Sequence, residues 1–357
     1  MFIVSPKWMF LNNKKFETGK SLLIDGPIIK DILDTKSVKK YYSNVNSFEY
    51  PNHILMPTFT ESYIDMDDCS NETDIDRKIK VLLKNGVTRL QAITKDYRKL
   101  LSHNFDNNID IGYMISFDGK DCNQNKITDI ITMLDFFKSD PTKKFSFNLT
   151  NILDFENDII QKIASISNEI SINLHIQGDT LRKIKDKSQI REFVKFWDKI
   201  NLLDSCYLHS FFNQNENWLS CMNKKSVKLM INYNNIDSIE KINIFLSLIE
   251  KKYTCILITD RNNTFNLYDT LKFISRLNTG DINNYESKII HSITTNTSDI
   301  FSRKNDTGCI KKDLIASFNI FDYSINNFSV QNDSHKLCNL DNQSLSNVWS
   351  AGKQVIF

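Results

Sequence analysis

The sequence predicts an α/β protein in which a (β/α)8 barrel of the TIM type is inserted in a small composite β-sandwich formed by both ends of the chain. Eight short apolar runs alternate with longer amphipathic segments through the middle of the chain. Parallel strands need crossover helices and are buried on both faces, so this alternation is typical of a closed parallel barrel. The two ends of the chain have instead the pattern of short strands joined by turns.

This pattern divides the 357 residues into two units. Residues 1–52 and 308–357 are expected to form the β-sandwich, and residues 53–307 the barrel. Since about 250 residues is an ordinary size for a barrel domain, the division leaves a small second unit.

The first 52 residues contain two β-like patterns. The first covers residues 2–4 and 8–11. The second is a hairpin in which residues 21–24 turn at Asp25-Gly26 into residues 28–29, because Asp-Gly between apolar residues favours a tight hairpin turn.

The barrel strands and helices are expected at regular intervals. The strands cover residues 55–60, 87–93, 111–116, 144–149, 170–176, 205–210, 227–232 and 254–259. The helices cover residues 73–84, 124–138, 154–168, 188–201, 237–251 and 266–278. Apolar residues recur in these helices at a spacing of three to four, which places them on one face.

The chain after the barrel is β-like again. Residues 313–322 and 347–357 have this pattern, and the polar stretch 324–347 between them is expected to be rich in loops. Strands from both ends of the chain can therefore pair in one unit that the barrel interrupts.

Composition excludes several classes of protein. The 45 basic and 43 acidic residues give a net charge of +2, which offers no electrostatic reason to bind nucleic acid or an anionic membrane. No stretch reaches about 18 uninterrupted apolar residues, so no membrane span is predicted. The seven cysteines form no CxxC pair, and no signal peptide pattern opens the sequence. A cytoplasmic protein with reduced thiols is expected.

Short segments along nearly the whole chain resemble motifs of one family. They are Ile28-Ile29, Met56-Pro57-Thr58-Phe59, Asn85-Gly86-Val87-Thr88, residues 289–300, residues 308–315 and residues 348–356. In this order and spacing they resemble the amidohydrolase superfamily, closest to its deaminase and chlorohydrolase branch. The resemblance implies a metal-dependent barrel inside a composite β-sandwich.

The resemblance also implies a site. In the family, two histidines after strand one, one after strand five and an aspartate after strand eight hold the metal, and a histidine after strand six orients the substrate. His175, His209 and Asp260 match the positions after strands five, six and eight. Such ligands hold zinc or iron, which lowers the pKa of a bound water to about 7 for attack on a C–N bond.

The match is incomplete. Tyr63 and Asp65 stand where the His-x-His pair is expected, and Gly178 stands where the family has a glutamate, with Asp179 one residue late. Thr58 replaces a glycine. The implied metal ligands are therefore His175, Asp260 and, at most, Asp65.

The other implied roles follow from the same resemblance. His209, Asp179 and Asp260 are the candidate catalytic residues, and Tyr63 and His209 the candidate substrate contacts. All of them are expected at the carboxyl ends of barrel strands, where barrel active sites are built.

Three interpretations remain open. The chain is an active hydrolase of cyclic amidines with an altered zinc or iron site, an inactive protein that binds a small molecule, or a structural partner of an active homologue. A homodimer is also compatible with the sequence. Simpler roles are open as well, because buried histidines are often only hydrogen-bonded, Asp260 can pair with Arg261, and Asp65 can lie in a solvated loop. The combined loss of two histidines and the glutamate favours reduced or lost activity, with zinc or iron bound substoichiometrically or not at all.

Overall fold

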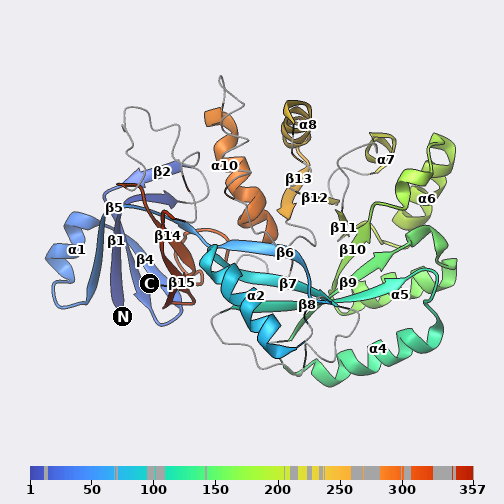
Figure 1. The fold of residues 1–357 in the computed structure, drawn as a ribbon, viewed down its shortest axis with the longest axis horizontal. Helices are drawn as coiled ribbons and strands as arrows, with labels where there is room; N and C mark the ends of the chain where they lie inside the picture. The colour runs from blue at the N-terminus through green and yellow to red at the C-terminus, as the bar shows by residue number, and fades with distance from the viewer. Residues whose placement is uncertain are drawn as a thin grey trace.

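A computed structural model shows the arrangement of the chain (Figure 1). It describes residues 1–357 except 12–14, 68, 70, 95–100, 102–108, 141–142, 205, 210–215, 223–226, 233–235, 237, 259–267, 269–281, 299, 301–306, 325–339, 341–342 and 357. The described strands form two sheets, one from the middle of the chain and one from its two ends. Both termini lie in the second sheet, on the left of Figure 1.

The middle of the chain forms the predicted eight-stranded parallel barrel. Its strands follow one another in chain order, each paired in parallel with the next, and the last lies beside the first. They are β6 (Phe59–Asp65), β7 (Val87–Thr94), β8 (Asp110–Asp118), β9 (Lys144–Thr150), β10 (Asn173–Gln177), β11 (Cys206–His209), β12 (Lys228–Asn232) and β13 (Thr254–Ile258).

The two ends of the chain form one mixed sheet, in the order β16-β15-β14-β5-β1-β3-β4, with β2 paired to β1. The strands are β1 (Phe2–Leu11), β2 (Lys15–Thr18), β3 (Lys20–Asp25), β4 (Ile28–Asp34), β5 (Ser47–Pro57), β14 (Phe318–Asp322), β15 (Leu345–Ser350) and β16 (Lys353–Ile356). The Ile29 amide donates to Leu314 and the Gly352 amide to Ala316, both at 2.8 Å, so residues 313–316 link the two far ends of the sheet. The sheet therefore curls around its own small core.

The expected first barrel strand, residues 55–60, is wrong in its position. Residues 55–57 are the end of β5, which belongs to the terminal sheet. Leu55 faces the core of that sheet, and the next residue, Met56, faces the barrel core on the other side. The chain enters the barrel at Phe59. A continuous apolar run does not reveal where the chain passes from one sheet to the other, and the domain boundaries at residues 52 and 308 stay a prediction.

Helices follow the barrel strands on the outside (Figure 1). They are α2 (Glu72–Lys84), α4 (Gln124–Phe137), α5 (Asn157–Glu169), α6 (Lys187–Lys199), α7 (Glu216–Cys221), α8 (Ile239–Glu250) and α10 (Ile282–Ile293), while α1 (Thr35–Tyr41) lies beside the terminal sheet. The side chains of Asn71, Asn123 and Ser238 accept backbone hydrogen bonds at the starts of α2, α4 and α8, which explains why those helices begin there.

Two further segments complete the comparison with the sequence. The motif at residues 289–300 begins in the last turns of α10, which ends at Ile293, and continues through a short 3-10 turn, Thr295–Thr297. The helix expected at residues 266–278 lies, apart from Tyr268, outside the described residues, and so does most of the loop-rich stretch 324–347.

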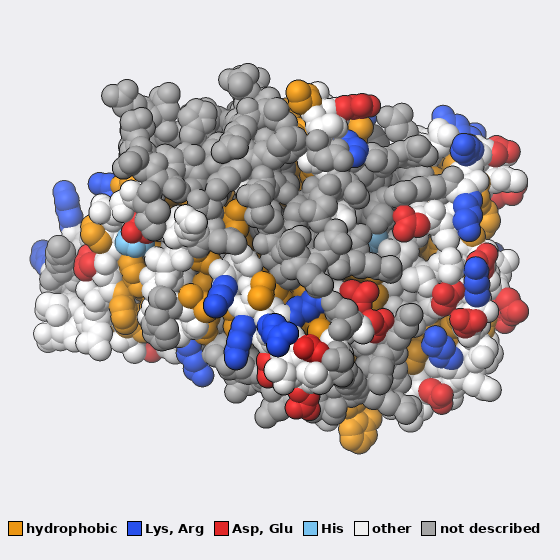
Figure 2. Space-filling model, in the orientation of Figure 1, with side chains coloured by type: hydrophobic (Ala, Val, Ile, Leu, Met, Phe, Trp, Pro, Cys, Tyr) orange, Lys and Arg blue, Asp and Glu red, His pale blue; other side chains and the backbone are white. Residues whose placement is uncertain are grey.

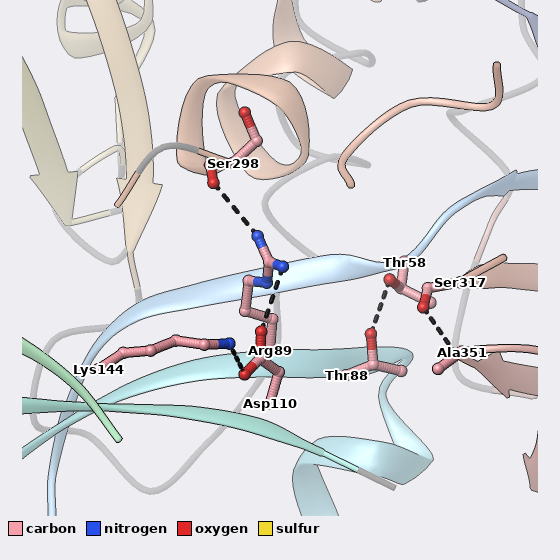
Figure 3. A network of polar contacts seen from close by, with 8 residues as sticks. All are labelled: Thr58, Thr88, Arg89, Asp110, Lys144, Ser298, Ser317 and Ala351. Atoms are coloured by element: carbon pink, nitrogen blue, oxygen red, sulfur yellow. Dashed lines mark hydrogen bonds and ion pairs between the residues drawn. The ribbon is translucent and has the colours of Figure 1, made fainter. Parts of the chain in front are cut away.

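Charged side chains close the amino-terminal end of the barrel (Figure 3). Asp110, at the start of β8, pairs with Arg89 at 3.1 Å and with Lys144. Arg89 also donates to the carbonyl oxygen of Ser298 at 3.2 Å. Because this end is sealed by ion pairs and by the segment after α10, the opposite, carboxyl end is the one left for a functional site.

The surface shows mixed charge. On the face drawn in Figure 2, Lys and Arg side chains of the described residues lie beside Asp and Glu side chains, in agreement with the net charge of +2. Within the described part of the chain, every helix is too short or too polar to cross a membrane.

Candidate functional site at the mouth of the barrel

The structure brings three of the predicted site residues into contact. Tyr63 comes from the end of β6, His175 from β10 and His209 from the last position of β11. All three side chains are buried, with at most 1% of each residue exposed. Their meeting follows from the barrel, because neighbouring parallel strands direct alternate side chains into one interior.

The two histidines are hydrogen-bonded to each other. His175 Nδ1 lies 2.9 Å from His209 Nε2, and the His175 ring stacks on Tyr207 with ring centres 4.7 Å apart. Burial lowers the pKa of His209 to about 3. Burial also lowers the pKa of His175 well below its usual value, and the neighbouring His209 and Lys228 lower it further. Both rings are therefore neutral at pH 7, one donating to the other.

Tyr63 occupies the space next to this pair. Its ring meets the His209 ring edge to face, with centres 4.5 Å apart and an angle of 62° between the planes. Its hydroxyl oxygen accepts a hydrogen bond from Gln177 Nε2 at 3.1 Å. A bulky phenol therefore stands where the family motif has a histidine.

A line of neutral polar groups continues from Tyr63 across three more strands. Gln177 Nε2 also donates to Asn148 Oδ1 at 3.0 Å, and Asn148 Nδ2 donates to Ser116 Oγ at 3.0 Å. These residues were missed in the sequence, although a signal was present. Residues 144–150 alternate strictly between polar and apolar side chains, which indicates one polar face in this strand.

The remaining predicted residues lie elsewhere. Asp65 is partly exposed at the end of β6, and its Oδ1 accepts the backbone amide of Asp67 at 2.9 Å. Asp179 is exposed in the turn after β10. Asp260 lies outside the described residues.

The donors that the structure describes do not fit a catalytic zinc or iron site. Such a site needs three protein ligands and an open position. His175 keeps one buried ring nitrogen, Nε2, with no hydrogen-bond partner in the described part of the chain, and this nitrogen could supply one ligand, since the Nδ1 of the same ring is engaged by His209. Among the described residues, no three His, Cys, Asp or Glu side chains gather closely enough to hold a metal ion.

A cavity of about 770 Å³ opens beside Tyr63, over the carboxyl ends of β6 to β9. It is lined by Tyr63, Asp65, Asp67, Ile93, Thr94, Ile115, Ser116, Asp118, Asp121, Lys126, Ile130, Asn148, Thr150 and Asn151. Neither histidine is in this lining. Cavities of roughly 300–1,000 Å³ are the usual size for small-molecule sites, so the mouth has room for a ligand that does not touch the histidine pair.

Comparison with known proteins places the fold. No family model and no curated protein matches the sequence. Solved structures do match over the full length. Aminofutalosine deaminase from Helicobacter pylori, in complex with methylthio-coformycin, is similar with a TM-score of 0.78 and 13% identity, covering 100% of both chains.

Two further solved structures contain zinc. An adenosine deaminase from Xanthomonas campestris with bound zinc has a TM-score of 0.76 and 10% identity, covering 99% of this chain and 92% of that one. Atrazine chlorohydrolase from Arthrobacter aurescens TC1, complexed with zinc, has a TM-score of 0.73 and 12% identity, covering 100% and 95%. The chain therefore has the same fold as these two deaminases and this chlorohydrolase.

Proposed function

We propose that the protein is a degenerate member of the deaminase and chlorohydrolase branch of the amidohydrolase superfamily, with reduced or no hydrolysis of C–N bonds, and that its barrel mouth binds a small molecule without turnover. The observation that carries the proposal is the direct hydrogen bond between His175 and His209, packed against Tyr63. One nitrogen of each ring is engaged by the other histidine, and the Tyr63 ring lies beside His209 at a position where the family would have a metal ligand.

The missing imidazoles support this proposal, because they weaken metal binding. Removing histidines from the first barrel strand removes two ligands, and second-shell hydrogen bonds do not replace a ligand. Asp65 stands at one of the two positions of the missing histidines and has a carboxylate that could bind a metal. Its side chain, however, accepts a backbone hydrogen bond in the turn that follows β6.

The state of the proton-transfer groups supports it as well. With a pKa of about 3, His209 takes up a proton at pH 7 only at a high free-energy cost, and its Nε2 is held by His175. Asp179 is exposed to solvent, whereas a carboxylate that transfers protons during catalysis works best when burial tunes its pKa. The balanced charge gives no electrostatic reason to bind nucleic acid or an anionic membrane, which favours a small-molecule ligand. The cytoplasmic location and the homodimer stay predictions.

Metal analysis and activity assays test the proposal together. Protein purified without chelators is expected to contain substoichiometric zinc and iron, and to leave adenine, guanine, cytosine and triazine compounds unchanged. The double variant Tyr63→His/Asp65→His returns the missing imidazoles and is expected to gain bound zinc. The matched control Tyr63→Phe/Asp65→Asn changes the same positions without adding a ligand and is expected to gain none.

One result would overturn the proposal. It is stoichiometric zinc or iron in the unmodified protein that disappears in His175→Ala, together with turnover of any compound of the panel. The protein would then be an active hydrolase with an altered ligand set.

A further inference from the structure

The cavity beside Tyr63 has a floor of neutral dipoles. Asn148 is fully buried, and its amide is held in place on one side by Gln177 and on the other by Ser116. Tyr63, Ser116 and Asn148 are in the lining, so they contribute hydroxyl and amide groups to the cavity, while Gln177 supports them from outside it. Such a floor can orient a polar group of a ligand but does not balance a full charge.

Part of the cavity wall is apolar. Ile93, Ile115 and Ile130 come from β7, β8 and α4 and contribute branched aliphatic side chains to the lining. Aliphatic walls favour a ligand with an apolar body, since burying its surface is worth roughly 25 cal/mol per Å².

Acidic side chains dominate the charged part of the lining that the described residues form. Four carboxylates, Asp65, Asp67, Asp118 and Asp121, and one ammonium group, Lys126, line the cavity within this part of the chain. Asp118 is fixed by hydrogen bonds from Asn151 Nδ2 at 2.9 Å and from the Lys120 amide at 3.0 Å. Burial opposes ionisation of Asp118, but these hydrogen bonds hold its pKa below the usual value.

We propose that this cavity binds a small organic cation with an apolar body, such as an aryl amidine or a protonated aromatic amine. The aliphatic walls take the body, the carboxylates attract the charge, and the floor of amide and hydroxyl groups orients the ligand. This inference rests on the proposed function, because it names the ligand class of a mouth that binds without turnover.

A matched set of probes tests the class. Benzamidine, benzamide and benzoate have nearly the same shape and carry charges of +1, 0 and −1 at pH 7. Isothermal titration calorimetry of the full chain in the presence of EDTA is expected to show benzamidine binding at least about tenfold more tightly than benzamide, and no binding of benzoate. Higher salt is expected to weaken benzamidine and not benzamide.

Variants of opposite sign test the location. Asp118→Asn and Asp121→Asn each remove a carboxylate of the lining and are expected to weaken benzamidine about tenfold. Lys126→Gln removes the ammonium group and is expected to tighten the binding of benzamidine. The control Asp129→Asn changes the same charge at an exposed position of α4 outside the lining and is expected to have no effect. Thermal unfolding of each variant without ligand confirms that it is folded.

The inference is overturned if benzamide binds as tightly as benzamidine, if no probe binds, or if folded Asp118→Asn and Asp121→Asn both bind benzamidine as the unmodified protein does. These measurements need neither metal nor turnover. If they fail, the result of the metal analysis is not affected. If a metal-dependent activity is found, the proposed function is overturned, and the charge preference of the cavity is measured independently of that result.

Discussion

Replacement of Asp110 by alanine is expected to lower the free energy of unfolding by about 3 kcal/mol. Asp110 Oδ2 lies 3.1 Å from Arg89 Nη2, and its Oδ1 accepts a hydrogen bond from Lys144. The Arg89 and Lys144 side chains are only 5% and 8% exposed, so the variant leaves two positive charges inside the base of the barrel without this carboxylate. Figure 3 shows the three side chains and the Ser298 carbonyl that remains as a partner of Arg89.

The magnitude follows from burial. Removing one partner of a buried ion pair costs about 3–5 kcal/mol, and the lower end applies here because Asp110 itself is 31% exposed, which lets water reach the cations. Asp25→Ala is the matched control, since Asp25 pairs with Lys30 at 3.4 Å with both side chains 54% exposed. That pair is worth about 0–1 kcal/mol.

Urea unfolding followed by tryptophan fluorescence and circular dichroism measures both effects. Asp110→Asn, which keeps the shape but not the charge, is expected to be destabilised almost as much as Asp110→Ala. A loss below about 1 kcal/mol in Asp110→Ala, equal to that in Asp25→Ala, would refute the reasoning that this network holds the base of the barrel.

Two further predictions concern the histidine pair and the terminal sheet. Because the pKa of His209 is about 3 in the folded protein and about 6.5 in an unfolded chain, the unfolded state binds this proton first as the pH falls. The stability contributed by this group is complete above about pH 6.5 and is lost by about 1.4 kcal/mol per pH unit down to about pH 3. His209→Gln should therefore flatten the decline of the urea midpoint with falling pH. An unchanged slope would contradict a buried, neutral ring. Gly352 has φ +77°, and a Cβ there would lie 2.0 Å from the Gly26 carbonyl oxygen, whereas Gly19 has φ +69° with nothing within 4 Å. Gly352→Ala should therefore lower the melting temperature more than Gly19→Ala, with an additional loss of about 1–3 kcal/mol. Equal losses would show that the turn between β15 and β16 does not pack closely against the turn at Gly26.

The alternation of apolar runs and amphipathic segments was enough to predict the barrel. The strands of a closed parallel barrel are short and rich in apolar residues, the helices between them are amphipathic, and this succession is visible along the chain without any knowledge of partners. The Asp25-Gly26 hairpin between β3 and β4 was predicted for a similarly local reason, since the turn needs a residue that accepts positive φ, and Gly26 has φ +56°.

The passage from β5 to β6 could not be located in this way. Leu55, Met56 and Phe59 are all fully buried, although they face two different cores. Local sequence reports burial, but it does not report which of two cores a side chain enters.

The candidate site could likewise be predicted only in part from the sequence. The motifs in the sequence singled out Tyr63, His175 and His209, and the departure at Tyr63 was visible as a missing histidine. Only the tertiary structure shows that the two histidines bond to each other, because they are not opposite one another in the sheet: His175 is in register with Tyr207, and His209 with Gln177. Their contact is diagonal and depends on the stagger of the closed barrel. The same closure brings Ser116, Asn148, Gln177 and Tyr63, from four strands, into one polar line. The sequence by itself determined which side chains point into the barrel, and the closure of the barrel decided which of them meet.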